Sequence, residues 1–155
     1  MNRIFTLTFV ALLTVCAFAQ TDQPSAKEVE VKNTLARFVR AFDNLDWETF
    51  RSAFADDATV FYPRAFAQRA DGRSEFEHNF RQVFEQIRAG RSKGPYMDLQ
   101  PQNLRIQIAG DVAIVTFHLD DRAGFVNRRT IILSKFPEGW RIIHLHASEV
   151  PIPAP

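Results

Sequence analysis

Two histidines that stand two residues apart, His144 and His146, are the first candidates for chemistry in this chain. On a β-strand they would share one face with Trp140 and Ser148. Such a pair could bind a metal ion or transfer a proton, but a zinc site needs at least one more ligand, and the predicted strands offer only His118. We therefore favour a structural role, in hydrogen bonds across a sheet or at a subunit interface, and we expect neither a metal ion nor a cofactor.

A second set of residues could serve acid–base chemistry in a pocket. This chemistry requires a carboxylate or a histidine beside a donor that stabilises developing negative charge, and Tyr62 could be that donor. Glu149 shares the strand phase of Leu145 and Ala147, so it could face the interior near the rim of a pocket. The alternative for Glu149 is an ordinary position on the solvent-exposed surface.

Two arginines are further pocket candidates. Arg129 shares the strand phase of Ile131 and Leu133; if these face the interior, Arg129 does too, and it then requires an anionic partner. Arg64 follows Pro63 and could lie at the mouth of the pocket. Solvent-exposed surface is the alternative for both arginines.

The spacing of apolar residues predicts three amphipathic helices that would help to position these side chains. Ser25 and Glu28 form a capping-box pattern before the first helix, whose apolar residues recur every three or four positions over 31–42. Asp46 is expected to cap a short second helix that ends at residues 56–57.

A third helix is predicted over residues 74–89. Ser74 and Glu77 repeat the capping-box pattern, and Phe76 and Phe80 begin another apolar stripe.

The remaining segments predict strands. Residues 58–62 form an apolar run that Pro63 ends. From residue 104 the hydrophobic period changes to two, and short turns separate strands over 104–108, 111–119, 125–136 and 140–150. Four strands joined in this way form an antiparallel meander. We therefore expect an α+β fold, with three N-terminal helices packed on a strongly curved antiparallel sheet.

The chain contains 15 phenylalanines, many of them on the predicted helices. A twisted sheet closed by aromatic helices would form a cone, and side chains would not fill its wider end. Apolar hollows of this kind commonly bind ligands. Phe76 and Phe80 are therefore candidate pocket residues, together with Ile131, Leu145 and Ala147 of the strands. The alternative is that these side chains simply fill the core.

The first 19 residues have the pattern of an export signal. Arg3 provides the positive charge, residues 4–18 are apolar, and small residues at Ala17 and Ala19 fit a cleavage site, so we expect cleavage after Ala19. The alternative is a short N-terminal membrane anchor, although the apolar run is short for a span.

The remainder divides into three parts. Residues 20–27 would be a flexible leader, residues 28–150 the folded domain, and residues 151–155 a proline-rich tail that does not continue a sheet.

Composition excludes several classes of function. The only cysteine, Cys16, lies within the expected signal, so the mature chain has neither disulfides nor cysteine metal sites, and Val15 before it argues against lipid attachment. Beyond the signal, Lys and Arg balance Asp and Glu, whereas nucleic-acid binders typically carry a basic surplus. No later segment is apolar enough to form a stable membrane anchor.

The order of these elements and the C-terminal sequence resemble the SnoaL-like, nuclear-transport-factor-2-like superfamily. The most specific match is Gly139-Trp140-Arg141-Ile142-Ile143-His144-Leu145-His146-Ala147-Ser148, which is similar to an ending found near the calcium/calmodulin-dependent kinase association domain. Residues 46–50 and 54–58 also fit, and the resemblance covers about residues 28–150. It implies a cone-shaped α+β barrel around a pocket, and a homodimer or larger ring packed through the sheets.

The resemblance leaves the activity open, because the superfamily includes isomerases, dehydratases, cyclases and non-catalytic assembly domains. The kinase association domain has basic or polar residues at pocket positions where this chain has Phe76, Ile131 and Ala147, which favours an apolar ligand over a small carboxylate. We therefore expect an exported protein, periplasmic or secreted, that self-associates and binds a small, mostly apolar molecule. The alternatives are a cofactor-independent isomerase, dehydratase or cyclase that uses a pocket carboxylate or histidine with Tyr62, and a domain for assembly alone.

Overall fold

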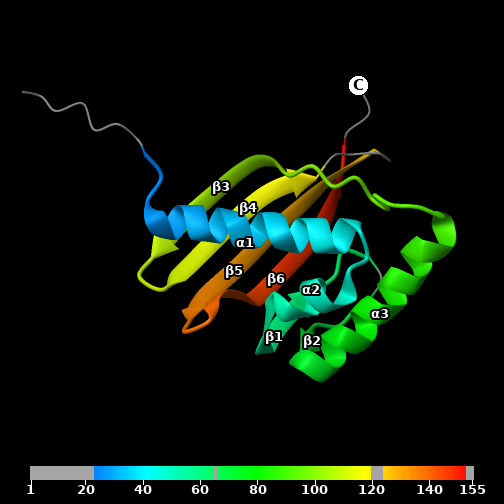
Figure 1. Cartoon of the computed structure of the whole chain (residues 1–155). Coiled ribbons are helices and arrows are strands. Elements are labelled where there is room, and N and C mark those ends of the chain that lie inside the picture. The colour runs from blue at the N-terminus through cyan, green and yellow to red at the C-terminus, as the bar shows by residue number, and fades with distance from the viewer. Residues whose placement is uncertain (1–22, 65, 120–123, 153–155) are drawn as a thin grey trace, which may run out of the picture.

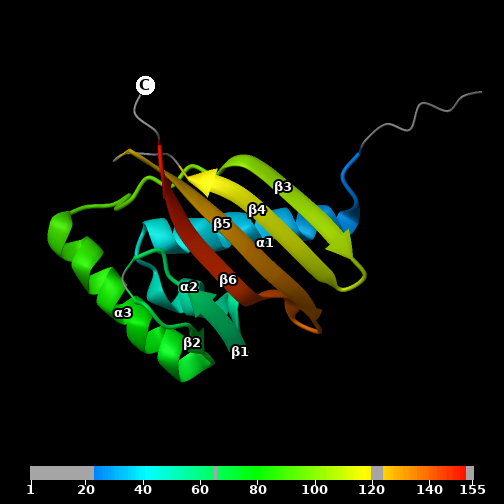
Figure 2. The same cartoon turned by 180° about the vertical axis from the view of Figure 1, so that it is seen from behind.

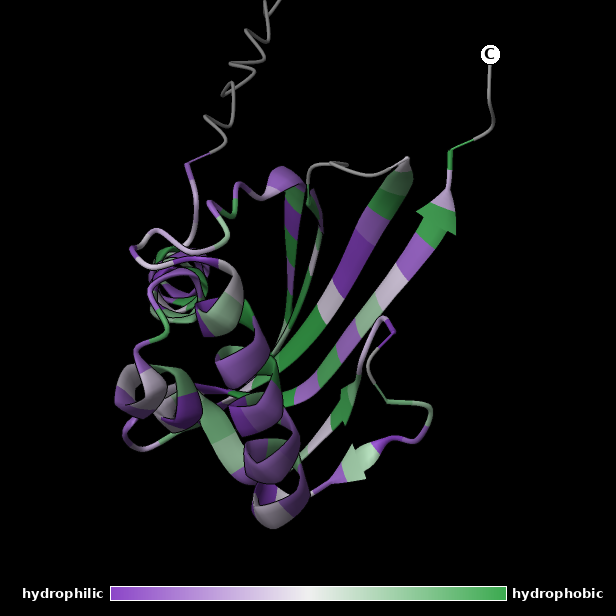
Figure 3. Ribbon diagram, turned by 90° about the vertical axis from the view of Figure 1, so that its right-hand side faces the viewer, coloured by the Kyte–Doolittle hydropathy of each residue, from purple (hydrophilic) through white to green (hydrophobic). Residues whose placement is uncertain are grey.

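Three helices pack on one side of a six-stranded sheet in the computed structural model, which describes residues 23–64, 66–119 and 124–152 (Figure 1). The helices are α1 (Ala26–Asp43), α2 (Trp47–Ser52) and α3 (Arg73–Gly90). The strands are β1 (Phe54–Phe61), β2 (Ala70–Asp71), β3 (Gln102–Ala109), β4 (Val112–Leu119), β5 (Phe125–Phe136) and β6 (Gly139–Pro151). Views from behind and from the side show that the described helices leave the other face of the curved sheet uncovered (Figures 2 and 3). The predicted α+β class is confirmed.

The strands follow the order β2-β1-β6-β5-β4-β3, and the predicted meander forms its larger part. The sheet is mixed rather than wholly antiparallel, because β1 joins β6 in parallel, with Val60 opposite Leu145. The strand expected at 58–62 is longer and begins at Phe54, and the short β2 was not expected because two residues show no periodicity. With β2 and β3 as its edges, the described sheet stays open and does not close into a barrel.

The first two helices begin where the sequence predicts. The Ser25 side chain accepts a hydrogen bond from the backbone N–H of Glu28, and the Asp46 side chain accepts one from that of Thr49. The helix α1 begins at Ala26, so the last residues of the expected leader are helical, and Lys27 reaches the carbonyl of Gly110 at 2.8 Å.

The third helix lies where it was predicted, but its expected capping box and the expected end of α2 were wrong. The helix α3 begins at Arg73 with Gly72 as its N-cap, so Ser74 and Glu77 form no capping box, and the Glu77 carboxylate is occupied by arginines instead. Residues 56–57 do not end α2, which stops at Ser52; they are exposed positions within β1. Charged residues at a helix end and on an exposed strand position look alike in sequence, because both positions are solvated.

An aromatic cluster centred on Phe50 holds the helices against the sheet. The Phe50 ring is fully buried, and its centroid lies 5.3 Å from that of Phe38 on α1, 4.7 Å from that of Phe80 on α3 and 5.3 Å from that of Phe54 on β1. A fully buried aromatic side chain contributes about 1.5–3 kcal/mol relative to an exposed one. One residue of the six-residue helix α2 therefore joins three neighbouring elements.

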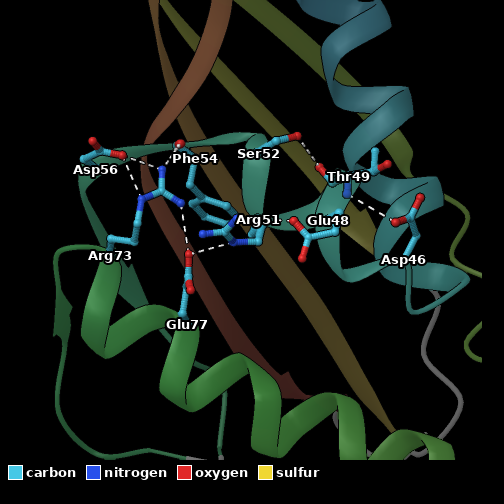
Figure 4. Close-up of polar contacts among 9 residues, drawn as sticks. All are labelled: Asp46, Glu48, Thr49, Arg51, Ser52, Phe54, Asp56, Arg73 and Glu77. Atoms are coloured by element: carbon cyan, nitrogen blue, oxygen red, sulfur yellow. Dashed lines mark hydrogen bonds and ion pairs between the residues drawn. The ribbon is translucent and has the colours of Figure 1, made fainter.

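A network of charged side chains adds polar links between the same elements (Figure 4). Arg73 donates to Asp56 on β1 at 2.7 Å and to Glu77 on α3 at 3.0 Å, and Arg51 of α2 donates to the same Glu77 oxygen at 3.0 Å. Burial alone would raise the pKa of the Glu77 carboxyl, but the hydrogen bonds from the two arginines outweigh it and lower that pKa. Glu77 is therefore ionised and shared between two cations.

A β-bulge in β6 changes which side chains face the helices. Ile132 of β5 lies opposite His144 while Leu133 lies opposite Ile142, so Ile143 is an extra residue without a partner in the register. Trp140 and Ile142 before the bulge therefore share the inner face with Leu145, Ala147 and Glu149 after it. The prediction that Trp140 shares a face with the histidines was wrong, because one inserted residue reverses the alternation.

The strand β6 runs one residue further than expected. Pro151, assigned to the tail, lies opposite Phe125 and ends the strand, and Ile152 donates its N–H to the carbonyl of Gly124 at 2.9 Å. The expected export signal and the last three residues of the tail lie outside the described residues. No helix of the described part is both long enough and apolar enough to span a membrane.

Replacing Glu77 by glutamine should destabilise the fold by about 1–3 kcal/mol, because two arginines lose their charged acceptor. Folding lowers the pKa of the Glu77 carboxyl, so its stabilising effect is fully present when the pH is above the pKa of glutamate in the unfolded chain, about 4.3. The effect disappears as the pH falls and the carboxyl becomes protonated, so the difference between the variant and the wild type should shrink. Urea unfolding at neutral and acidic pH measures both effects.

The matched control is Glu85→Gln, a substitution at an exposed position of the same helix. It should change the free energy of unfolding by less than about 0.5 kcal/mol. Equal effects of the two variants would show that the network contributes nothing specific.

Candidate functional site

A cavity of about 310 Å³ lies between the helices and the inner face of the sheet. Its walls are mainly apolar side chains from α1, α3, the connection before β3, and strands β4 to β6: Phe38, Val39, Phe42, Phe80, Val83, Ile87, Met97, Leu99, Phe117, Leu119, Ile131, Leu145 and Ala147. A second hollow, of about 590 Å³, is an open groove beside the start of α3, and none of the predicted site residues lines it.

The structure brings together all but one of the predicted pocket residues. Those that line the cavity are Tyr62, Arg64, Phe80, Arg129, Ile131, Leu145, Ala147 and Glu149. The prediction for Phe76 was wrong: this ring is fully buried in the core, with its centroid 4.8 Å from that of Phe54. Phe76 lies one helical turn before Phe80 on α3, so its ring packs against Phe54 in the core and does not reach the cavity.

Sequence reasoning missed several wall residues, for two reasons. Phe38 and Phe42 of α1 were recognised as part of an apolar stripe, and the stripe itself could have marked them as wall residues. Met97 and Leu99 lie in a connection without periodicity. That connection is held by Asp43, whose carboxylate accepts the backbone N–H of Met97 at 2.9 Å, a contact that no local pattern indicates.

Charged and polar groups gather at one end of the cavity. Glu149 forms an ion pair with Arg64, and the Glu149 side chain is 16% exposed whereas that of Arg64 is 57% exposed. The Arg64 guanidinium also lies over the Phe125 ring, 4.2 Å from its centroid. Asn127 and Arg129 complete this end. The Glu149 carboxylate is thus largely buried at the mouth of the cavity, where it pairs with the more exposed Arg64.

Arg129 lies deeper than Arg64. Burial lowers the pKa of its guanidinium, and the charge of Glu149 only partly opposes this shift. Its one hydrogen bond within the described structure is donated by Nη1 to the backbone carbonyl of Arg128 at 2.9 Å. Arg128 itself is exposed on the opposite face of the sheet, as the strand phase predicts.

The Tyr62 phenol is a neutral donor inside the cavity. Burial raises the pKa of Tyr62 above its ordinary value, and an interaction with Asn79 offsets only part of this rise. The buried hydroxyl has no hydrogen bond of ordinary geometry with the described residues. Tyr62 and Glu149, the donor and the carboxylate of the acid–base hypothesis, both line this cavity.

The two histidines lie on the outer face of the sheet, away from the cavity. Thr59 Oγ1 lies 2.7 Å from Nδ1 of His144, across the parallel β1–β6 pair. Burial, followed by the nearby charges of His146 and Arg69, lowers the pKa of His144. Trp140 instead faces inward and donates from Nε1 to Glu30 on α1 at 3.0 Å.

No metal site forms around the histidines within the part of the chain that the structure describes. His118 lies two strands away, opposite Arg128, and no group of three or more His, Asp or Glu side chains could hold a metal ion there. Ser148 also faces outward, between the strand positions of His146 and Val150.

Residues 31–153 match the family model of the SnoaL-like domain. No curated protein matches the chain. The more specific resemblance, to the branch near the kinase association domain, stays a prediction.

Solved structures share the fold at low sequence identity. An NTF2-like protein of unknown function from Pseudomonas putida KT2440 has a TM-score of 0.66 and 23% identity, over 78% of this chain and 84% of its own. A candidate dehydratase of the NTF2-like family from Streptomyces avermitilis has a TM-score of 0.63 and 21% identity, over 81% and 96%. A cystatin-like fold protein from Burkholderia xenovorans LB400 has a TM-score of 0.62 and 17% identity, over 81% and 92%. The cone-like arrangement is therefore that of a known fold.

The buried Tyr62 phenol should resist ionisation in the folded protein. Because its pKa is raised on folding, its contribution to stability is present below the unfolded value, about 10, and is lost as the pH rises. As the pH rises from about 9 to about 11, the free energy of unfolding should therefore fall less in Tyr62→Phe than in the wild type.

Absorbance at about 295 nm, where phenolate absorbs, would follow ionisation directly. The titrations of wild type and Tyr62→Phe should coincide up to about pH 10, the ordinary phenol pKa. A wild-type phenolate signal that Tyr62→Phe removes below that pH would contradict the burial of this hydroxyl.

Proposed function

The chain belongs to the SnoaL-like domain family, and on that premise we propose that its cone binds a small, mostly apolar molecule. The observation that carries the proposal is the cavity itself: about 310 Å³, walled by aromatic and aliphatic side chains, with polar groups gathered at one end. Pockets that bind small molecules typically combine apolar walls with a few placed polar groups, and this cavity lies at the lower limit of their usual volume range of about 300–1,000 Å³.

The positions of the wall residues support a preformed site. Helices α1 and α3 and strands β4 to β6 supply most of the wall. Phe50, which does not line the cavity, fixes α1 and α3 relative to β1 through its ring contacts. A ligand would therefore displace water from apolar surface without first ordering the protein, which favours binding.

Reducing the cavity should weaken binding without unfolding the protein. Ala147 lies on the inner face of β6, and Ala147→Leu adds three carbon atoms toward the cavity. A neutral fluorescent amine, 1-aminoanthracene, should bind the wild type saturably and bind this variant roughly tenfold more weakly, a change of about 1.4 kcal/mol.

Ala89→Leu, on the exposed side of α3, is the matched control and should leave the affinity unchanged. Thermal unfolding of each variant verifies the fold. Absence of saturable probe binding to the wild type, or equal affinity in Ala147→Leu, would refute the proposed pocket. Native mass spectrometry of protein taken from its own host would then identify a co-purified molecule where the probe experiment succeeds.

We further propose that the chain self-associates through the outer face of the sheet. Apolar side chains there are more than a third exposed, including Phe61 at 38% and Ile114 at 37%, and no described element covers them. An apolar patch of this kind typically marks an interface. Ile114 of β4 lies opposite Ile132 of β5, so the apolar side chains of this face continue across two neighbouring strands.

A charge on β4, within this apolar patch, should separate the copies. Ile114→Glu is expected to reduce the molar mass measured by light scattering to that of one chain, whereas Ala89→Glu on α3 should not. A monomeric wild type would refute self-association.

We also propose that the protein is exported, which the pattern of residues 1–19 supports. N-terminal sequencing of the protein from its host should then give a sequence that begins at Gln20.

A further inference from the structure

The polar end of the cavity carries a positive charge that the described residues do not neutralise. Among the described residues, three charged side chains line the cavity: Arg64, Arg129 and Glu149. Glu149 is paired with Arg64, whereas Arg129 forms no ion pair with the described residues. The surplus charge therefore belongs to Arg129, the more deeply placed of the two arginines.

Arg129 has hydrogen-bonding capacity to spare. A guanidinium group carries five N–H donors in a planar fork, and in the described structure only one acceptor, the backbone carbonyl of Arg128, is in place. Such a fork matches the two oxygens of a carboxylate. Burial has removed part of the water that would otherwise satisfy these donors, as the lowered pKa of Arg129 also indicates.

The described carboxylates other than Glu149 are poorly placed to neutralise the charge of Arg129. Asp98 lines the outer mouth of the cavity but is exposed, and solvent screens its charge. Its side chain also accepts a hydrogen bond from Gln100 at 3.3 Å. The inner wall beside Arg129 is apolar, with Phe117 and Ala147 as its neighbours in the register on either side.

We propose that the bound molecule is an amphipathic monoanion, whose carboxylate pairs with Arg129 and whose apolar body lies among the phenylalanines of α1 and α3. This inference rests on the proposed function, because it assigns a chemical class to the ligand of the same cavity. Phe42 and Phe80 lie on the helical wall, so a chain or ring anchored at Arg129 would extend toward them. A cation would be repelled by Arg129, and a neutral molecule would leave its charge without a partner.

Matched probes separate the anionic head from the apolar body. Decanoate and decan-1-ol have the same carbon skeleton. Decanoate would be used below its critical micelle concentration and decan-1-ol below its solubility limit to displace 1-aminoanthracene from the protein. The wild type should bind decanoate at least about tenfold more tightly than decan-1-ol, because charge-assisted hydrogen bonds are stronger than neutral ones.

Arg129→Gln should remove this preference, with at least a tenfold loss for decanoate and less than a twofold change for decan-1-ol. Arg129→Lys should keep part of the preference, since it retains the charge but not the fork. Arg128→Gln, at the neighbouring exposed arginine on the other face, is the matched control and should behave as the wild type. Retained binding of decan-1-ol shows that each variant is folded.

The outcomes distinguish the two proposals. If decanoate and decan-1-ol bind the wild type equally, or if Arg129→Gln leaves the preference intact, the anionic head is refuted and the apolar pocket survives. If neither compound displaces the probe because the probe itself does not bind, both proposals fail together.

Discussion

The packing around Phe50 is the constraint on which the rest of the structure depends. This ring contacts aromatic rings from both long helices and from β1, and together these rings fill the narrow end of the cone. Close packing around Phe50 leaves no room for a ligand, and the cavity lies beside this packed region, between α1, α3 and strands β4 to β6. Core and cavity are thus successive parts of one apolar interior, and the Arg51–Glu77–Arg73 network reinforces the closed end from outside.

The bulge at Ile143 decides what the open end contains. Without the extra residue, a strand that buries Trp140 and Ile142 would place Glu149 on the outer face. With it, one strand supplies core side chains near its start and cavity side chains near its end. Bulges recur beside functional sites because they redirect side chains in this way. The histidines face outward for the same reason, and the hydrogen bond between His144 and Thr59 joins β6 to β1.

Local patterns in the sequence were sufficient to predict much of the fold. The caps at Ser25 and Asp46 are contacts within a few residues, and the period of two in β3 to β5, with the inward phase of Arg129, can be identified from the sequence of each strand alone. The parallel pairing of β1 with β6 and the attachment of Met97 to Asp43 depend on residues far apart in the chain. Phe76 illustrates the same limit: its stripe indicates burial, but only the surrounding rings determine that it lies in the core and not at the cavity.

The position of β6 at the centre of the sheet has a consequence for how the chain folds. This strand pairs with β5 on one side and with β1 on the other, so it joins segments that lie about 85 residues apart in the chain, as its pairing of Val60 with Leu145 shows. While β6 is still inside the ribosome, the helices have only an incomplete sheet to cover, and their aromatic faces stay accessible. Pairing between distant segments slows folding and prolongs the time during which a partly folded chain exposes apolar surface.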